Sequence, residues 1–106
     1  MKVKIPFMEQ FREPMLAGIK TCTSRTKKYG EEGDTFEVFG AMFEIQSVCR
    51  FPLRAVASEL YKYEGFNQPE EFIDIWTSLH PRKGYDPEQR VNVHFFRREI
   101  IEKEED

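Results

Sequence analysis

The sequence has no long apolar run. A helix that crosses a membrane needs about 20 consecutive apolar residues, and charged or polar side chains interrupt this chain well before that length. In the first residues, Val3 and Ile5 alternate with lysines, and they do not open the apolar stretch that is typical of a signal peptide. We therefore expect a cytoplasmic protein that has no membrane partner.

Cysteine and histidine are also scarce. The two cysteines, Cys22 and Cys49, lie far apart and form no C-x-x-C pair of the kind found in zinc and thiol-redox sites. The two histidines, His80 and His94, have no cysteine or acidic residue at the spacing of zinc ligands. We therefore predict two thiols in or near the core, no metal and no cofactor.

The remaining composition is rich in both apolar and charged residues. Hydrophobic residues make up 40% of the 106 residues and charged residues 33%, and ten residues are phenylalanine. This is enough apolar material for one core, so we expect a single domain over residues 1–106, with residues 102–106 as a frayed acidic tail. The net charge of −3 is unevenly distributed, because residues 1–30 carry seven basic and two acidic side chains. A uniformly basic nucleic-acid-binding protein is excluded, but a local basic face is not.

Apolar spacing predicts strands at both ends of the chain and short helices between them. Alternation is typical of strands near residues 3–7, 20–26, 36–38, 43–48 and 91–95. Spacings of three and four residues predict helices within 8–19, 53–61 and 69–79. This pattern predicts an α+β fold, built on a small curved β-sheet or β-barrel with short flanking helices.

One segment is more specific than these patterns. It reads Gly18-Ile19-Lys20-Thr21-Cys22-Thr23-Ser24-Arg25, and the pair Gly33-Asp34 and the triplet Glu64-Gly65-Phe66 follow it. It resembles the signature of ASCH domains, which belong to the PUA-like superfamily, with Gly18, Lys20 and Arg25 at matching positions. Thr23 stands where the broader family has glutamate. The motif G-x-K-T-x-T-x-R is similar to that of small bacterial ASCH proteins that hydrolyse N4-acetylcytidine.

This resemblance implies a metal-independent amidohydrolase that acts on a non-peptide C–N bond of a modified nucleoside. It also implies a catalytic Lys–Thr–Glu triad, which falls on Lys20, Thr23 and Glu64 in this sequence. The match of Glu64 needs a gap of one residue before His80-Pro81. The basic and polar positions around the motif then form the expected set for binding substrate or RNA: Thr21, Arg25, Lys27 and Lys28.

Two assignments of chemical roles remain open at this point. In one, a neutral Lys20 removes the proton of Thr23, while Glu64 supplies a proton to the leaving amine. In the other, a charged Lys20 stabilises the oxyanion, and Glu64 activates Thr23 or a water. On an extended strand Thr23 and Arg25 share one face, so we expect Ser24 to point away from this site.

A binding module is the alternative to an enzyme. PUA-like domains commonly bind RNA, and basic side chains near the motif are suited to phosphates, with Tyr29 and Tyr85 as possible stacking faces. A second basic set consists of Arg82, Lys83 and Arg90. A ribonuclease that uses the same cleft is a third hypothesis, and a purely structural role is the last.

Overall fold

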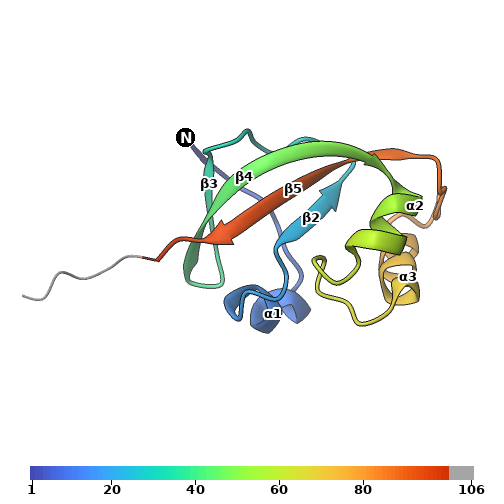
Figure 1. The fold of residues 1–106 in the computed structure, drawn as a ribbon, viewed down its shortest axis with the longest axis horizontal. Helices are drawn as coiled ribbons and strands as arrows, with labels where there is room; N and C mark the ends of the chain where they lie inside the picture. Colours follow the sequence, from blue (N-terminus) through green and yellow to red (C-terminus); the bar gives the residue numbers. More distant parts are fainter. Residues whose placement is uncertain (101–106) are drawn as a thin grey trace, which may run out of the picture.

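The computed structural model describes residues 1–100 and contains a five-stranded mixed sheet (Figure 1). Its strands are β1 (Lys2–Val3), β2 (Cys22–Arg25), β3 (Thr35–Val38), β4 (Ala41–Pro52) and β5 (Arg90–Arg98). The helical segments are η1 (Glu9–Phe11), α1 (Arg12–Leu16), α2 (Leu53–Ala55), η2 (Val56–Leu60) and α3 (Pro69–Leu79). The predicted acidic tail, residues 102–106, lies outside the described residues.

The strands follow the order β1-β3-β4-β5-β2 across the sheet. β1 pairs with β3 in parallel, and the other neighbours are antiparallel. β1 and β2 are edge strands, so in residues 1–100 the sheet is open and not closed into a barrel. The predicted α+β fold with a curved sheet is confirmed, and the barrel alternative is wrong. Its curvature follows the long β4–β5 pair (Figure 1), whose register shifts between Ile45 and Ser47.

The main core fills the side of the sheet on which phenylalanines gather. Phe36, Phe43 and Phe96 pack with ring centroids 5.4 to 5.6 Å apart. The edge-to-face contacts stabilise the core beyond what the buried area of these rings contributes. Val91 and Val93 alternate with Phe96 along β5, so they are fully buried on the opposite face of the sheet. Figure 1 shows α1 and α3 on the same side of the curved sheet, at different places along it. The site described below lies between residues 6–11, which precede α1, and the segment that contains α3.

Two details of the predicted helices are wrong. The segment expected over 8–19 is a 3-10 turn followed by the short helix α1, and Ile19 is 60% exposed and does not belong to its apolar face. Leu79, whose apolar spacing is part of the pattern that predicts the helix over 69–79, is 54% exposed. Both residues lie at or beyond a helix end, where the chain direction changes and the 3.6-residue period no longer determines burial. Among the described residues, no helix combines the length and hydropathy that a membrane crossing requires.

Candidate functional site

The end of α1 positions Lys20. Gly18 has a φ of 75°, and its N–H donates to Met15 O, while the N–H of Ile19 donates to Pro14 O. This is the Schellman arrangement, in which a left-handed residue closes the helix and reverses the chain. Because the turn completes at Ile19, Lys20 leaves it directly toward β2.

A second helix end of the same kind positions Glu64. Gly65 has a φ of 99°, its N–H donates to Lys62 O, and the N–H of Phe66 donates to Tyr61 O. The triplet that stood out in the sequence therefore lies at the capped end of the turns that continue η2, with Glu64 as the last residue before the left-handed glycine. Two glycine caps thus bring together side chains that are 44 positions apart.

Lys20 and Glu64 form a buried ion pair. Lys20 is 2% exposed and Glu64 4%, and Lys20 Nζ lies 3.0 Å from Glu64 Oε1. Nζ also donates to the backbone oxygens of Cys22 at 2.9 Å and Glu64 at 2.8 Å, and it lies 4.5 Å from the centroid of the Phe11 ring. An ammonium group has three N–H donors, and all three have an oxygen partner here.

The pair also joins the helix end to the start of β2. Tyr63 O accepts the N–H groups of Thr21 and Cys22, so the last carbonyls of the helix bind β2 and the Lys20 ammonium together. A cation at a helix C-terminus is favourable, because the terminal carbonyls carry partial negative charge. Removing one partner of a buried pair leaves an uncompensated charge, which typically costs about 3–5 kcal/mol.

Ser24 is the residue of this site that the sequence analysis missed. Its hydroxyl donates to Glu64 Oε2, so the prediction that Ser24 points away from the site is wrong. The reason is that β2 is an edge strand. The pocket extends around its free edge, and Thr23, Ser24, Arg25 and Thr26 all line it. Alternation along a strand separates two faces but does not indicate that both border one cavity.

Thr23 is held by different partners. Arg25 Nε donates to Thr23 Oγ1 at 3.0 Å, and the Arg25 guanidinium also donates to Pro6 O. The guanidinium lies 5.0 Å from the Phe7 ring centroid and 5.5 Å from that of Tyr29. Burial lowers the pKa of Arg25 from its ordinary value. These contacts hold the cation beside the Thr23 hydroxyl.

His94 holds the other side of Thr23. Its Nε2 accepts the Tyr29 N–H at 3.0 Å, so Nδ1 carries the ring proton toward Thr23 O, 3.3 Å away. The ring is fully buried, so His94 has a structural role inside the protein and is not a surface residue. Burial lowers the pKa of His94, and the positive charges of Arg25 and Lys28 lower it further.

The other predicted binding residues do not line the pocket. Thr21 contributes its backbone to β2 and to the helix end. Lys27 Nζ lies 5.1 Å from the Tyr29 ring centroid, and Lys28 Nζ is 2.8 Å from Glu31 Oε2. Both lysines are exposed beside the pocket.

The two thiols are unpaired, as predicted. Burial, followed by the charge of Glu64, raises the pKa of the Cys22 thiol, which excludes Cys22 as a thiolate nucleophile at neutral pH. Cys49 is half-buried. No group of three or more His, Cys, Asp or Glu side chains within residues 1–100 is arranged to hold a metal ion.

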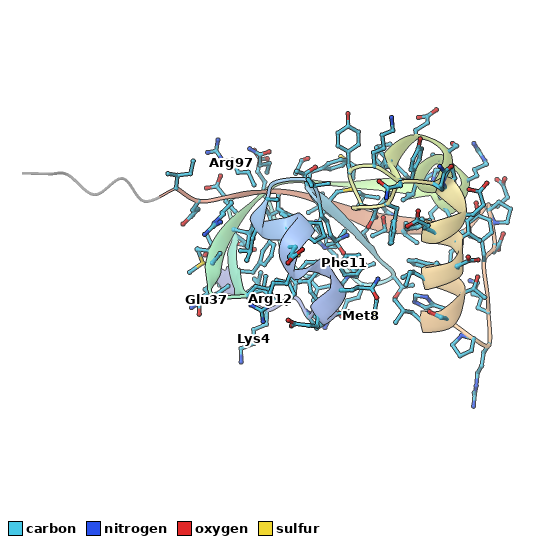
Figure 2. All side chains as sticks on the ribbon, turned by 90° about the horizontal axis from the view of Figure 1, so that it is seen from below. Lys4, Met8, Phe11, Arg12, Glu37 and Arg97 are labelled. Atoms are coloured by element: carbon cyan, nitrogen blue, oxygen red, sulfur yellow. The ribbon has the colours of Figure 1, made fainter. Side chains whose placement is uncertain are left out.

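The ion pair lies in a pocket of about 440 Å³, a volume typical of small-molecule sites. The N-terminal segment forms one wall, and Met8 and Phe11 lie toward α3 in the view of Figure 2. The segment 66–80 forms the facing wall. The aromatic side chains of the lining are Phe7, Phe11, Tyr29, Phe66, Phe72 and Trp76. The pocket therefore has apolar, mostly aromatic walls around a few charged and hydroxyl groups.

Solved structures identify the fold in which this pocket occurs. No family model matches the sequence, and no curated protein matches it significantly. An ASCH domain from Lactobacillus crispatus superimposes with a TM-score of 0.77 at 12% identity, over 92% of this chain and 79% of that chain. The protein has the fold of an ASCH domain.

Two further solved structures are similar in fold to this chain. The hypothetical protein PH0355 superimposes with a TM-score of 0.72 at 16% identity, over 92% of this chain and 99% of that chain. The protein PF0455 from Pyrococcus furiosus gives 0.63 at 14% identity, over 92% and 97%. The resemblance seen in the motif is therefore confirmed for the fold.

The Gly65 cap is predicted to be more sensitive to substitution than the Gly18 cap. A Cβ at Gly65 would lie 3.3 Å from Lys20 Cβ, whereas one at Gly18 meets nothing within 4 Å. Gly18→Ala should lower the free energy of unfolding by about 1–2 kcal/mol through its left-handed backbone alone. Gly65→Ala should cost more, because it also displaces Lys20. Urea denaturation measures both, and equal losses would contradict the role given to the Lys20 contact.

His94 is predicted to make the protein less stable in acid. Because the folded state lowers the pKa of this ring, the unfolded chain binds the proton more readily than the folded protein does. The free energy of unfolding should therefore decrease as the pH falls below about 6.5, the ordinary pKa. Urea denaturation across this range measures the slope, which should become shallower in His94→Gln. His80→Gln is the control that retains His94, and equal slopes in both variants would contradict the assignment.

Proposed function

We propose that this protein is an amidohydrolase that removes the acyl group from a modified nucleoside such as N4-acetylcytidine. The observation that carries the proposal is the buried Lys20–Glu64 pair, which lies in an aromatic-walled pocket beside the hydroxyls of Thr23 and Ser24. Amide hydrolysis needs a nucleophile, a base and a group that stabilises the oxyanion. This pocket contains a candidate for each.

Lys20 is proposed to act as a charged group. Its three N–H donors are all engaged with oxygens of Glu64 and Cys22. An ammonium group in this arrangement has no lone pair with which to accept a proton. Of the two role assignments, this geometry favours the one in which Lys20 stabilises negative charge and Glu64 is the general base.

Thr23 is proposed to be the nucleophile. The Arg25 Nε–H that its Oγ1 accepts is a charge-assisted donor, which favours negative charge on that oxygen as the proton leaves. Thr23 Oγ1 attacks the acyl carbon while its proton passes to Glu64. The C–N bond then breaks, and the leaving amine takes the proton from Glu64. A water molecule hydrolyses the acyl-threonine ester, which releases the carboxylic acid and restores the hydroxyl.

Ser24 is proposed to be a positioning residue. Its hydroxyl donates to Glu64 Oε2, while Lys20 binds Oε1. The two contacts hold both oxygens of the carboxylate, which fixes the direction from which it accepts a proton. Catalytic groups held in this way lose little energy in reorganisation during the reaction.

RNA binding without catalysis is the second candidate. The observation in its favour is that Arg25 and Tyr29 line the pocket while Lys27 and Lys28 are exposed next to them. A base held in the pocket would leave its phosphates near these lysines. Such binding weakens steeply with salt, because each neutralised phosphate releases counterions.

The proposal predicts different results for the two neighbouring hydroxyls. The wild type should release cytidine from N4-acetylcytidine, measured by chromatography. Thr23→Ala should lose at least about 1,000-fold in kcat, because the nucleophile is gone, and Thr23→Ser should retain measurable turnover. Ser24→Ala should lose about tenfold in kcat with little change in KM, because Glu64 is less well oriented.

Two outcomes would contradict these assignments. Turnover that survives in Thr23→Ala but disappears in Ser24→Ala would make Ser24 the nucleophile. Absence of turnover in the wild type, together with salt-dependent binding of single-stranded RNA, would instead favour the binding module.

A further inference from the structure

Trp76 has a buried indole N–H that takes no part in the proposed chemistry. It is the single tryptophan of the chain, lies on α3 and lines the pocket. Only 3% of the residue is exposed. Its indole N–H has no hydrogen-bond partner among the described residues. Native structures nearly always satisfy a buried donor, because burying it without a partner typically costs more free energy than an ordinary hydrogen bond contributes.

The surroundings of Trp76 hold its ring in place. The His80 ring stacks on the indole, with centroids 4.1 Å apart and an interplanar angle of 23°. Because a carbonyl only accepts, the Nδ1–H of His80 donates to Trp76 O, 3.0 Å away. Phe72 packs at 6.0 Å. These contacts orient the indole in the wall of the pocket, and none of them is made by its N–H.

We propose that Trp76 recognises the ligand, by donating its indole N–H to a hydrogen-bond acceptor on a planar heteroaromatic ring. This inference rests on the proposed function, in which the acyl group of the same ligand meets Thr23, Lys20 and Glu64. The flat ring lies among the aromatic walls, and a ring carbonyl or ring nitrogen accepts from Trp76. A pyrimidine with an acylated exocyclic amine combines these features, whereas a simple aryl amide lacks the acceptor.

The wild-type protein tests binding directly. Because Trp76 is the single tryptophan, its fluorescence reports on the pocket without any variant. Titration with N4-acetylcytidine should change the emission saturably in the wild type and also in Thr23→Ala, which retains Trp76. An unchanged emission at ligand concentrations that support turnover would overturn the inference.

A substitution then tests the hydrogen bond itself. Trp76→Phe keeps an aromatic ring and removes the N–H, so KM for N4-acetylcytidine should rise about tenfold while kcat changes by less than about threefold. Acetanilide is the matched probe, because it carries the aryl amide but no ring acceptor. Its KM should be nearly the same in both proteins. An equal rise in KM for both compounds, or no rise for either, would overturn the inference.

These measurements separate the two proposals. Saturable fluorescence without cytidine release would contradict the amidohydrolase and leave recognition by Trp76 standing. In that case a direct comparison of affinities by calorimetry replaces KM, with the same tenfold loss expected in Trp76→Phe. Cytidine release with equal KM values in wild type and Trp76→Phe would contradict recognition alone.

Discussion

The ion pair between Lys20 and Glu64 is the constraint on which the site depends. Two opposite charges that are almost fully buried are tolerated only where their remaining hydrogen-bonding capacity is satisfied. Here the helix end, the start of β2 and the Ser24 hydroxyl supply those partners. The pair therefore requires that two chain reversals and one edge strand meet at a single place. Each of these elements is short, so their positions depend on this meeting more than on their own stability.

The edge position of β2 explains how two adjacent hydroxyls acquire different surroundings. Ser24 lies against the carboxylate of Glu64, while the Thr23 hydroxyl accepts from Arg25 and the Thr23 carbonyl from His94. In a central strand, neighbouring residues would face two separate layers, and a single small pocket would not include both. At a free edge the pocket reaches both faces. The site thus places an anionic and a cationic environment beside two adjacent residues, Thr23 and Ser24.

Much of the fold could be predicted from the sequence, because it depends on local patterns. Alternation indicated the strands around Phe36 and Val93, and the period of three to four residues indicated α3. The resemblance singled out Lys20 and Glu64. Their contact depends on Gly18 and Gly65, and a glycine that follows an apolar segment of helical spacing can be identified from sequence as a helix end. The contact of Ser24 with Glu64 could not be predicted in this way, because it depends on β2 being an edge strand. The unpartnered N–H of Trp76 could not be predicted from the sequence either, because a tryptophan at helical spacing is expected to be a core residue.

The distribution of charge in the pocket bears on the kind of ligand that it suits. Lys20 and Glu64 neutralise each other, so among the charged groups that line the pocket only Arg25 adds a net charge, and it is already engaged by Thr23 and Pro6. A phosphate placed inside would have to replace those contacts and lose its hydration in an apolar surrounding, which is costly. A neutral planar group loses much less on entering, and it gains contact with the aromatic walls. The polar amide bond of such a ligand would then meet the charged groups in a surrounding where their fields are weakly screened. The interior of the pocket is therefore better matched to a neutral base or amide than to a nucleic-acid backbone, whose phosphates are better served by the exposed Lys27 and Lys28.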